Sequence, residues 1–456
     1  MKQGEVRMYT CGPTVYQFAH IGNFRAYIFE DVLRRYLKYK GHRVIQVMNI
    51  TDVDDKTISG SRREGIPLSQ YTARYIKAFF DDLDALNIER AEFYPRATEH
   101  VDEMVALIKK LIDKGYGYKS EGSIYFDISK FKEYGMLSKV NVSELKPGAR
   151  VRADEYEKEE ARDFALWRAW DEDDGDVFWE TDIGKGRPGW HIECSAMSMK
   201  YLGEEFDIHT GGIDNIFPHH ENEIAQSRAA TGKGFVRYWL HCEHLLADGR
   251  KMSKSLGNYY TLRDLLDKGY DPRAIRYLLM FAHYKAPINF TEEGLKAAQN
   301  TVLSLIDFLD RLQEAKDDIG NTKYNEGLHE KALSTAREFE EYMDDDLDMP
   351  RAMAVVHDLA RETNRAIENG DASSENLEEI YDLLMRLDSV LGFLKHERER
   401  LTADDVRLME EREHARKRGD YAAADSIRTQ LLQRGIILED TPQGVRWRRI
   451  RPVTHQ

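Results

Sequence analysis

The sequence predicts an α/β protein: a Rossmann-like domain with a parallel sheet, interrupted by an insertion and followed by a helical bundle and a small C-terminal domain. Three observations predict this fold. A strand, a loop, a helix and a second strand follow one another near the N-terminus. Short mixed elements replace that pattern from about residue 100 to 188. From Thr291 to about Glu397 the periodicity is almost wholly helical, and a compact basic segment closes the chain.

The N-terminal segment has the order of a βαβ unit. Val6–Cys11 has the pattern of a strand, and the loop Gly12–Pro13 follows it. Apolar residues then recur at helical spacing over Phe24–Leu37, and Gly41 supplies a C-terminal stop. A largely apolar second strand, Val44–Ile50, comes at once. This order predicts a buried parallel sheet, with the free N–H groups of the helix facing a ligand such as phosphate.

Length, composition and charge bound the class of protein. A chain of 456 residues is too long for one ordinary core, so two or more domains are expected. With 32% charged residues, no apolar run near the roughly 20 residues of a membrane span and no export signal, we expect a cytoplasmic protein without membrane contact. The net charge of −15 argues against a general nucleic-acid coat, although a local basic surface can still bind RNA.

Two motifs suit the binding of phosphate. The first is His20–Asn23, between the first strand and its helix, where polar side chains can donate to phosphate and Gly22 permits close approach. A polar helix cap is the alternative. The second is Lys251–Asn258, in which two lysines three apart stand on a loop with serines and glycine. This pattern indicates a mobile cationic clamp for a pyrophosphate leaving group, with an exposed basic turn as the alternative.

Together the two motifs resemble the paired signatures of the class I aminoacyl-tRNA synthetases, which attack the α-phosphate of ATP with an amino acid carboxylate. Four further strings are similar to motifs of the cysteinyl-tRNA synthetase family. They are Tyr9–Tyr16, Asn49–Lys56, Gly189–Ser195 and Phe217–Glu223. The helical region and the basic tail extend the likeness to nearly the whole chain. The chain begins only a few residues before its first strand, where the family usually carries a further segment, as in a trimmed chain or one with an alternative start.

The resemblance implies ATP-dependent activation of cysteine to cysteinyl-adenylate and transfer to the 3′ end of cysteine-specific tRNA. The expected partners are tRNA(Cys), cysteine and ATP with Mg²⁺, and the protein is expected to be a monomer. The expected domains are the first half of the catalytic domain at 1–100, a connective insertion at 101–188, the second half at 189–235, the lysine-loop and stem-contact region at 236–297, a helical bundle at 298–397 and an anticodon-binding domain at 398–456.

Three cysteines are too few and too scattered for a disulfide framework. Cys11 ends the first strand, Cys194 opens a later helix, and His219 and Glu223 lie four apart on one helical face. Two thiolates, an imidazole and a carboxylate form a credible zinc set, although the spacing is not that of a compact zinc finger. Spacing alone does not exclude His220. The resemblance favours His219, because the family places its ligands for one Zn²⁺ per chain at positions that match these four residues.

A zinc ion would give this family a way to tell cysteine from serine. The two amino acids have nearly the same shape, so packing alone discriminates weakly between them. A soft thiolate bound to zinc offers a discrimination that hydrogen bonding does not. The insertion is also short for an editing domain as well as a platform for the tRNA end. We therefore expect no editing site.

The likeness also assigns residues around the metal and the nucleotide. Catalytic roles fall to Lys251, Lys254, His20 and Asn23. ATP binding is expected at His20, Gly22, Asn23, Lys251, Ser253 and Lys254. The expected substrate pocket contains Thr51, Trp190, His191 and His209, for which packed polar core residues are the alternative.

Three further groups have competing interpretations. Asp52, Asp54 and Asp55 are either a carboxylate cluster for a metal or, as we favour, an acidic turn at a helix N-terminus. Cys242 is expected to be a buried or incidental thiol. In the tail, an aromatic residue amid arginines suits stacking on an unpaired RNA base, with a solvated basic terminus as the alternative. The residues concerned are Arg446, Trp447, Arg448 and Arg449.

Two other functions remain open on sequence grounds. One is a ligase that joins cysteine to an amino-sugar, as in mycothiol biosynthesis, which would share the zinc site and the lysine loop. The other is a catalytically silent tRNA-binding protein. The helical region and the basic tail favour tRNA over an amino-sugar. The intact lysines Lys251 and Lys254 and the full zinc set argue against the silent protein.

Overall fold

The computed structural model describes residues 4–140, 150–151, 163–318, 322–396, 401–441 and 444–449. The chain divides into two compact units. The first comprises Met1–Leu262, Leu279–Thr291 and Asp346–Pro350. The second comprises Arg263–Leu278, Glu292–Asp345 and Arg351–Gln456. Among the described residues, no helix combines the length and the apolar character needed to cross a bilayer.

A four-stranded parallel sheet forms the centre of the first unit. Its strands, in spatial order, are β10 (Val236–Cys242), β9 (Phe206–Gly212), β1 (Glu5–Thr10) and β2 (Arg43–Met48). The chain passes from β1 to β2 on one side and only later to β9 on the other, so the connections diverge between β1 and β9. Such a switch point leaves a crevice at the carboxyl ends of the strands. The predicted Rossmann-like fold is confirmed.

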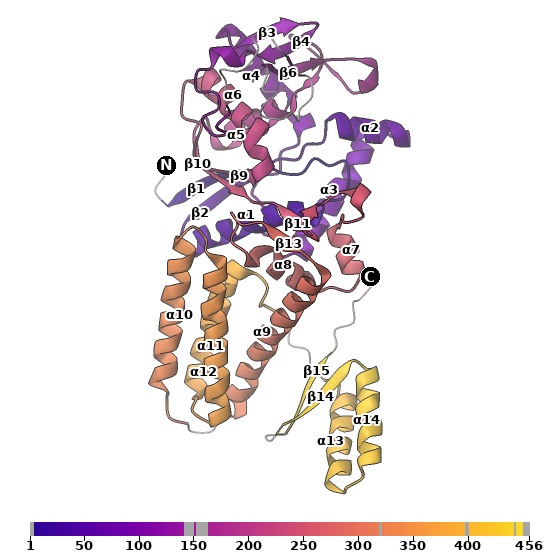
Figure 1. The fold of residues 1–456 in the computed structure, drawn as a ribbon, viewed down its shortest axis with the longest axis vertical. Helices are drawn as coiled ribbons and strands as arrows, with labels where there is room; N and C mark the ends of the chain where they lie inside the picture. Colours follow the sequence, from indigo (N-terminus) through magenta and orange to yellow (C-terminus); the bar gives the residue numbers. More distant parts are fainter. Residues whose placement is uncertain are drawn as a thin grey trace. The chain divides into compact units, whose positions relative to one another are not determined.

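Helices cover both faces of this sheet. Helix α1 (Ile21–Tyr39) connects β1 to β2 and lies on one face, while α5 (Trp190–Leu202) and α6 (Glu221–Thr231) lie on the other (Figure 1). Two further helices, α2 (Asp55–Glu64) and α3 (Leu68–Ala85), follow β2. The core between sheet and helices is apolar and includes Tyr9, Val47, Ile192, Phe206 and Ala225.

The predicted insertion between the two halves of the sheet domain contains a sheet of its own. It begins with α4 (Val101–Asp113). The strands that follow in spatial order are β3 (Gly117–Ser120), β4 (Ser123–Phe126), β6 (Asp163–Ala169), β8 (Gly184–Pro188) and β7 (Trp179–Thr181), with β5 (Arg150–Val151) paired to β6. Strand β8 runs directly into α5, so the insertion ends where the second half of the parallel-sheet domain begins.

The parallel sheet continues past residue 235, where the sequence analysis ended the second half of the catalytic domain. Strand β10 pairs with β9 along its whole length. A small sheet follows, in the spatial order β12 (Arg250–Lys251), β11 (Leu245–Ala247) and β13 (Ile288–Phe290). The lysine loop leaves this small sheet directly after β12.

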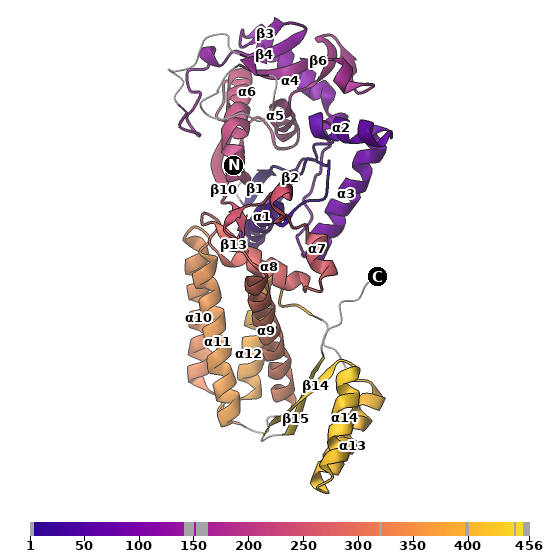
Figure 2. The same ribbon diagram turned by 45° about the vertical axis from the view of Figure 1, so that its right-hand side comes forward.

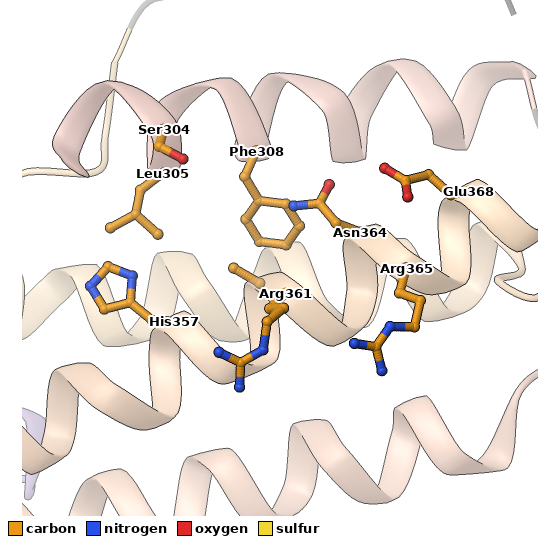
Figure 3. A pocket seen from close by; sticks show the side chains of 9 residues that line it. Ser304, Leu305, Phe308, His357, Arg361, Asn364, Arg365 and Glu368 are labelled. Carbon is orange, nitrogen blue, oxygen red and sulfur yellow. The ribbon is translucent and has the colours of Figure 1, made fainter. Parts of the chain in front are cut away.

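The second unit is built mainly of helices. They are α7 (Leu262–Asp267), α8 (Pro272–Phe281), α9 (Glu292–Asp318), α10 (Glu326–Asp344), α11 (Met349–Asn369) and α12 (Ser374–Leu391). Helix α12 packs on α9 and α10, as in a helical bundle. Figures 1 and 2 show the helices of this bundle, α9 to α12, from two directions. A groove of about 440 Å³ runs between α9 and α11, and Phe308, His357, Arg361 and Glu368 are among its lining residues (Figure 3).

The C-terminal part of the second unit has a small core of its own. Two helices, α13 (Ala403–Lys417) and α14 (Tyr421–Gln433), precede the hairpin of β14 (Ile436–Thr441) and β15 (Gly444–Arg449). The core consists of Leu408, Leu431, Ile436 and Leu438. The four predicted RNA-binding residues fall on β15, where their side chains lie outside the described residues. They are Arg446, Trp447, Arg448 and Arg449.

Candidate active site and metal centre

The structure brings all four predicted metal ligands together at the carboxyl ends of the parallel strands. Cys11 directly follows β1, Cys194 lies in the second turn of α5, and His219 and Glu223 flank the start of α6. One side-chain donor atom from each of the four residues lies within 4.8 Å of the others. The fold therefore brings Cys11 and Glu223 together, although more than 200 residues separate them in the sequence.

Two hydrogen bonds, made by the backbone N–H groups of Cys11 and Gly12, hold Cys11 in position. Its N–H donates to the carbonyl oxygen of Thr210 at 3.2 Å, which ties the end of β1 to β9. The N–H of Gly12 donates to Oδ1 of Asn49 at 2.8 Å. A Cβ atom on residue 12 would lie 1.7 Å from the carbonyl oxygen of Asn49, so only glycine fits there.

Glu223 connects the cluster to the neighbouring histidines. Its Oε2 accepts a hydrogen bond from Nε2 of His209 at 2.9 Å. Its Oε1 lies 2.9 Å from Nε2 of His219 but makes no well-formed hydrogen bond there, although the side chain is fully buried. A carboxylate oxygen placed beside the nitrogen of His219 in this way can bind a cation in place of the histidine proton.

The protonation of the cluster also fits a cation. Burial raises the pKa of both Cys11 and Cys194. Burial also favours a neutral Glu223, but His209 and His219 outweigh this and lower the pKa of Glu223 to about 2. Without a metal ion the thiols stay protonated next to an ion pair of Glu223 and His219, because Glu223 outweighs burial and raises the pKa of His219 to about 10. A bound divalent metal would supply the positive charge that favours two thiolates, so the donor set fits such an ion.

A second group of donors overlaps with the predicted one. Cys11, His209, His220 and Glu223 also lie within 4.8 Å of one another. The Nε2 atom of His220 lies 3.2 Å from Sγ of Cys11, and its Nδ1 lies 2.8 Å from Nε2 of His241. Both histidines that spacing left open therefore reach the centre, but only the group with His219 contains two thiols.

Three of the four predicted substrate-pocket residues contact side chains of the metal cluster. The rings of Trp190 and His219 stack with centroids 4.1 Å apart. The Nδ1 atoms of His191 and His219 lie 3.0 Å apart, and Nε2 of His191 has no hydrogen-bond partner among the described residues. His209 contacts Glu223, as described above. The hydroxyl of Thr51 donates instead to Oε2 of Glu193, the residue before Cys194, at 2.9 Å.

A cleft of about 250 Å³ links the metal cluster to the first phosphate motif. Its lining includes Cys11, His20, Gly22, Asn23 and Lys251. The end of β1, the N-terminus of α1 and the lysine loop therefore border one space. An amino acid side chain at Cys11 and a nucleotide at the start of α1 can meet in it.

His20 and Asn23 form a reciprocal cap at the start of α1. The Nδ1 atom of His20 accepts from the N–H of Asn23 at 3.2 Å, and Oδ1 of Asn23 accepts from the N–H of His20 at 3.0 Å. Burial lowers the pKa of His20 to about 4. The imidazole is therefore neutral and carries its proton on Nε2, where it can donate to a ligand. The two interpretations of the motif, helix cap and phosphate donor, are compatible.

The lysine loop sends its two lysines to different places. Lys251 lines the cleft, whereas Nζ of Lys254 donates to Oε1 of Gln17 at 2.6 Å in a neighbouring hollow of about 440 Å³. The N–H of Ser253 donates to Oδ1 of Asn258 at 2.9 Å. The loop also passes close to α1, because a Cβ on Gly22 would lie 2.8 Å from Cε of Met252.

The remaining acidic candidates have structural partners. Asp54 is the N-cap of α2 and accepts from the N–H of Thr57 at 2.7 Å. Asp52 accepts from Thr98, and Asp55 pairs with Arg168 and Arg187. The favoured interpretation, an acidic turn at a helix start, agrees with these contacts. In the described part of the chain, the three aspartates do not belong to either group of metal donors.

Cys242 is buried, as predicted. Its Sγ lies 3.8 Å from the carbonyl oxygen of Arg25, and burial raises its pKa to about 12.

Several residues at the site were not predicted. Glu193 binds Thr51, Asn49 holds the Gly12 loop, and Trp239 stacks on His209 with ring centroids 4.6 Å apart. Asn49 and Glu193 stand within the motifs that carried the family resemblance, so a polar residue in an otherwise apolar or helical string was the available signal. Trp239 gave no such signal, since aromatic residues are common in buried strands.

Known families match three parts of the chain. Residues 1–300 match the model described as tRNA synthetases class I (C) catalytic domain. Residues 338–395 match the DALR domain, and residues 398–448 match the cysteinyl-tRNA ligase anticodon binding domain. A curated protein of Brachyspira hyodysenteriae, named Cysteine--tRNA ligase, is 50% identical over 98% of this chain and 95% of its own length. The chain belongs to the cysteine–tRNA ligase family.

Other relatives agree with this family. A protein of Protochlamydia amoebophila with the same name is 47% identical over 98% of this chain and 94% of its own length. Among solved structures, Mycobacterium tuberculosis methionyl-tRNA synthetase in complex with methionyl-adenylate shares the fold, with a TM-score of 0.63 and 16% identity over 85% of this chain and 89% of that one. These matches support an aminoacyl-tRNA ligase and give no support to the amino-sugar ligase.

Proposed function

We propose that this member of the cysteine–tRNA ligase family activates cysteine with ATP to cysteinyl-adenylate and transfers the cysteinyl group to the 3′ end of tRNA(Cys). One observation carries the proposal. The group of two thiols, an imidazole and a carboxylate contributes Cys11 to the lining of the same cleft that His20, Asn23 and Lys251 border. That arrangement places donors that can recognise a thiol side chain next to groups that can bind phosphate.

The metal is one Zn²⁺ per chain, held by Cys11, Cys194, His219 and Glu223. When bound, zinc supplies a coordination position that accepts a thiolate far better than a hydroxyl group. The chain itself orients the donors: His209 holds Glu223, while His191 and Trp190 fix the ring of His219. This selection at the binding step removes the need for an editing site against serine.

The nucleotide binds as ATP with Mg²⁺ at the start of α1. The Nε2–H of His20 and the side chain of Lys251 face the phosphates, and Gly22 lets them approach. The carboxylate oxygen of cysteine attacks the α-phosphorus, a P–O bond forms, and pyrophosphate leaves. The site is completed by Asn23, Ser253 and Lys254. Lys254 leaves its hydrogen bond with Gln17, contacts the pyrophosphate leaving group and neutralises its charge.

The tRNA binds through the parts of the chain that follow the catalytic domain. The match of residues 398–448 to an anticodon-binding family supports this assignment. On β15, a strand with three arginines around one tryptophan suits phosphates and an unpaired base. The residues we propose are Arg446, Trp447, Arg448 and Arg449. We retain the domain order given above, with the second half of the catalytic domain extended to the end of β10, together with a monomeric state and a cytoplasmic location, as parts of this proposal.

Metal content and cysteine-dependent ATP–pyrophosphate exchange test the proposal together. The wild type should hold one zinc per chain and exchange pyrophosphate with cysteine but not with serine. Cys194→Ser should lose both the metal and the exchange, because it removes one of two thiolate donors. Cys242→Ser, which changes the third cysteine, should keep the metal.

Two outcomes would contradict the proposal. Stoichiometric zinc in Cys194→Ser would show that the ligand set is wrong. A zinc-loaded wild type without exchange at saturating ATP would favour the catalytically silent RNA-binding protein. Charging of tRNA(Cys) with cysteine completes the test, because adenylate formation alone does not identify the acceptor.

A further inference from the structure

Glu221, the first residue of α6, binds the predicted insertion through a buried carboxylate. Its Oε1 accepts from the N–H of Gly135 at 2.7 Å. Its Oε2 accepts from the N–H groups of Ser138 at 2.7 Å and Leu137 at 3.2 Å. The side chain is fully buried. Three backbone donors satisfy both oxygens of this buried side chain, so the contact is specific.

The next residue of α6 extends the same contact. Oδ1 of Asn222 accepts from the hydroxyl of Tyr134, which precedes Gly135 in the loop. Tyr134 is itself part of the apolar core of the first unit. The segment from Tyr134 to Ser138, which we name the clamp loop, is therefore fastened to α6 by its backbone and by a side chain.

The two contacts come from the turn that also carries metal donors. His219 and Glu223 lie on either side of Glu221 and Asn222, and a single helical turn presents one pair to the metal cluster and the other to the clamp loop. The helix is not continuous before this turn, because Phe217 has extended dihedral angles of φ −136° and ψ 132°. The start of α6 therefore depends on tertiary contacts more than a helix interior does.

We infer that Glu221 is a positioning residue that couples the clamp loop of the insertion to metal binding. His219 and Glu223 can ligate one ion only when the turn between them is formed, and Glu221 stabilises that turn from its other side. A metal that fixes the turn also fixes the two oxygens of Glu221 that accept from the three N–H groups of the clamp loop. Clamp-loop order in turn favours metal binding, since coupling between two binding events is reciprocal. The inference rests on the proposed metal site.

A second contact between α6 and this region provides a control. Glu133, just before the clamp loop, pairs with Arg228 near the end of α6 at 2.8 Å. Arg228 lies more than one turn beyond Glu223, and the pair is partly exposed. An exposed ion pair contributes little stability and does not involve the turn of the metal donors. Glu133→Gln therefore alters the same junction without the proposed coupling.

The experiment measures hydrogen–deuterium exchange of residues 134–140 and the zinc Kd in wild type, Glu221→Gln and Glu133→Gln. In Glu221→Gln one oxygen becomes an amide group that cannot accept from a backbone N–H. We expect faster exchange of the Gly135 and Ser138 amides and a zinc Kd raised about 10-fold, the range seen for residues that orient metal ligands. Removing zinc from the wild type should speed the exchange of the same amides. Glu133→Gln should change neither.

The outcomes separate this inference from the proposed function. An unchanged zinc Kd in Glu221→Gln, or clamp-loop amides in the wild type that do not respond to zinc removal, overturns the coupling alone. A wild type that binds no zinc overturns the proposed function and the coupling with it. The wild-type comparison with and without zinc needs no variant, so a folding defect of Glu221→Gln does not leave the inference untested.

Discussion

His20 combines a structural and a chemical task at one side chain. Its Nδ1 caps α1, and burial lowers its pKa from the ordinary value of 6.5 to about 4. The ring therefore stays neutral in the pH range in which an exposed histidine would change its charge. We predict that the KM for ATP shows no inflection from this residue between about pH 5.5 and 8. ATP–pyrophosphate exchange across this range measures it. An inflection near pH 6.5 that disappears in His20→Asn, which retains a capping side chain, would contradict the prediction.

His219 and His220 are neighbours that both reach the metal cluster. Only the group with His219 contains two thiols, and zinc favours sulfur donors over a further imidazole. We predict that His219→Ala lowers bound zinc severely, by a factor of about 10 or more at limiting metal, whereas His220→Ala retains most of it. Metal analysis after dialysis against a weak chelator measures the difference. The reverse order of the two variants would assign the ligand to His220.

The sequence could predict which residues carry the chemistry but not their second contacts. Cys11, Cys194 and Glu223 follow from their residue types and from the family motifs. The bond between His209 and Glu223 could not be predicted, because it joins a strand to a helix across the sheet. The position of Lys254 at Gln17 also depends on how the lysine loop lies over α1, which no local pattern specifies.

At the scale of an element, the lysine loop allows nucleotide chemistry to be tested separately from metal binding. Lys254 is held by Gln17 and lies in a hollow apart from the metal donors. We predict that Lys254→Ala slows adenylate formation about 100-fold or more, because a charge that meets the leaving group is lost, and leaves zinc content unchanged. Single-turnover kinetics and metal analysis on the same preparation measure both. Loss of metal would indicate misfolding of the site instead.

Two helices of the second unit end in glycines that allow a matched comparison. Gly370 follows α11 with φ +71°, and Gly392 follows α12 with φ +72°. A Cβ on residue 370 would meet no atom within 4 Å, whereas one on residue 392 would lie 2.9 Å from Nη2 of Arg276. Arg276 is fully buried, and its Nε donates to the carbonyl oxygen of Leu391 at 2.7 Å. The second glycine therefore carries a packing constraint that the first lacks.

We predict that Gly370→Ala lowers the free energy of unfolding by about 1 kcal/mol, the cost of a left-handed alanine. Gly392→Ala should lower it by about 3 kcal/mol, because Arg276 must also shift from its buried hydrogen bond. Urea denaturation followed by circular dichroism measures both. Equal losses in the two variants would mean that Arg276 moves without cost.

The elements were predictable to different degrees. The helices of the second unit show clear helical periodicity, and α1 and β2 have the expected apolar patterns and a glycine stop. The strands of the insertion are only two to seven residues long. Strand β6 begins with five buried residues instead of alternating buried and exposed ones. Strand β10 contains the exposed residues Arg237 and Tyr238 beside the half-buried Trp239, so its pattern is that of a partly exposed strand.

At the scale of the whole molecule, a metal ion at the donor cluster would cross-link the first unit. Its donors come from the end of β1, from α5 and from both sides of the start of α6, so one ion would hold together segments that are distant in sequence. An ion that binds the folded chain and not the unfolded chain stabilises the fold by about 2.7 kcal/mol when its free concentration is 100 times its Kd. Unit 2 contributes no donor to either group found in the described residues.

We therefore predict that a strong chelator lowers the unfolding temperature of the wild type by about 5 °C or more. Differential scanning calorimetry with and without the chelator measures this shift, and readdition of Zn²⁺ should reverse it. Cys194→Ser should unfold at the lower temperature in both conditions, because it has already lost the cross-link. Gly370→Ala, whose change lies in unit 2, should keep the full response to the chelator. A chelator response of the same size in Cys194→Ser would show that the stabilising ion lies elsewhere in the molecule.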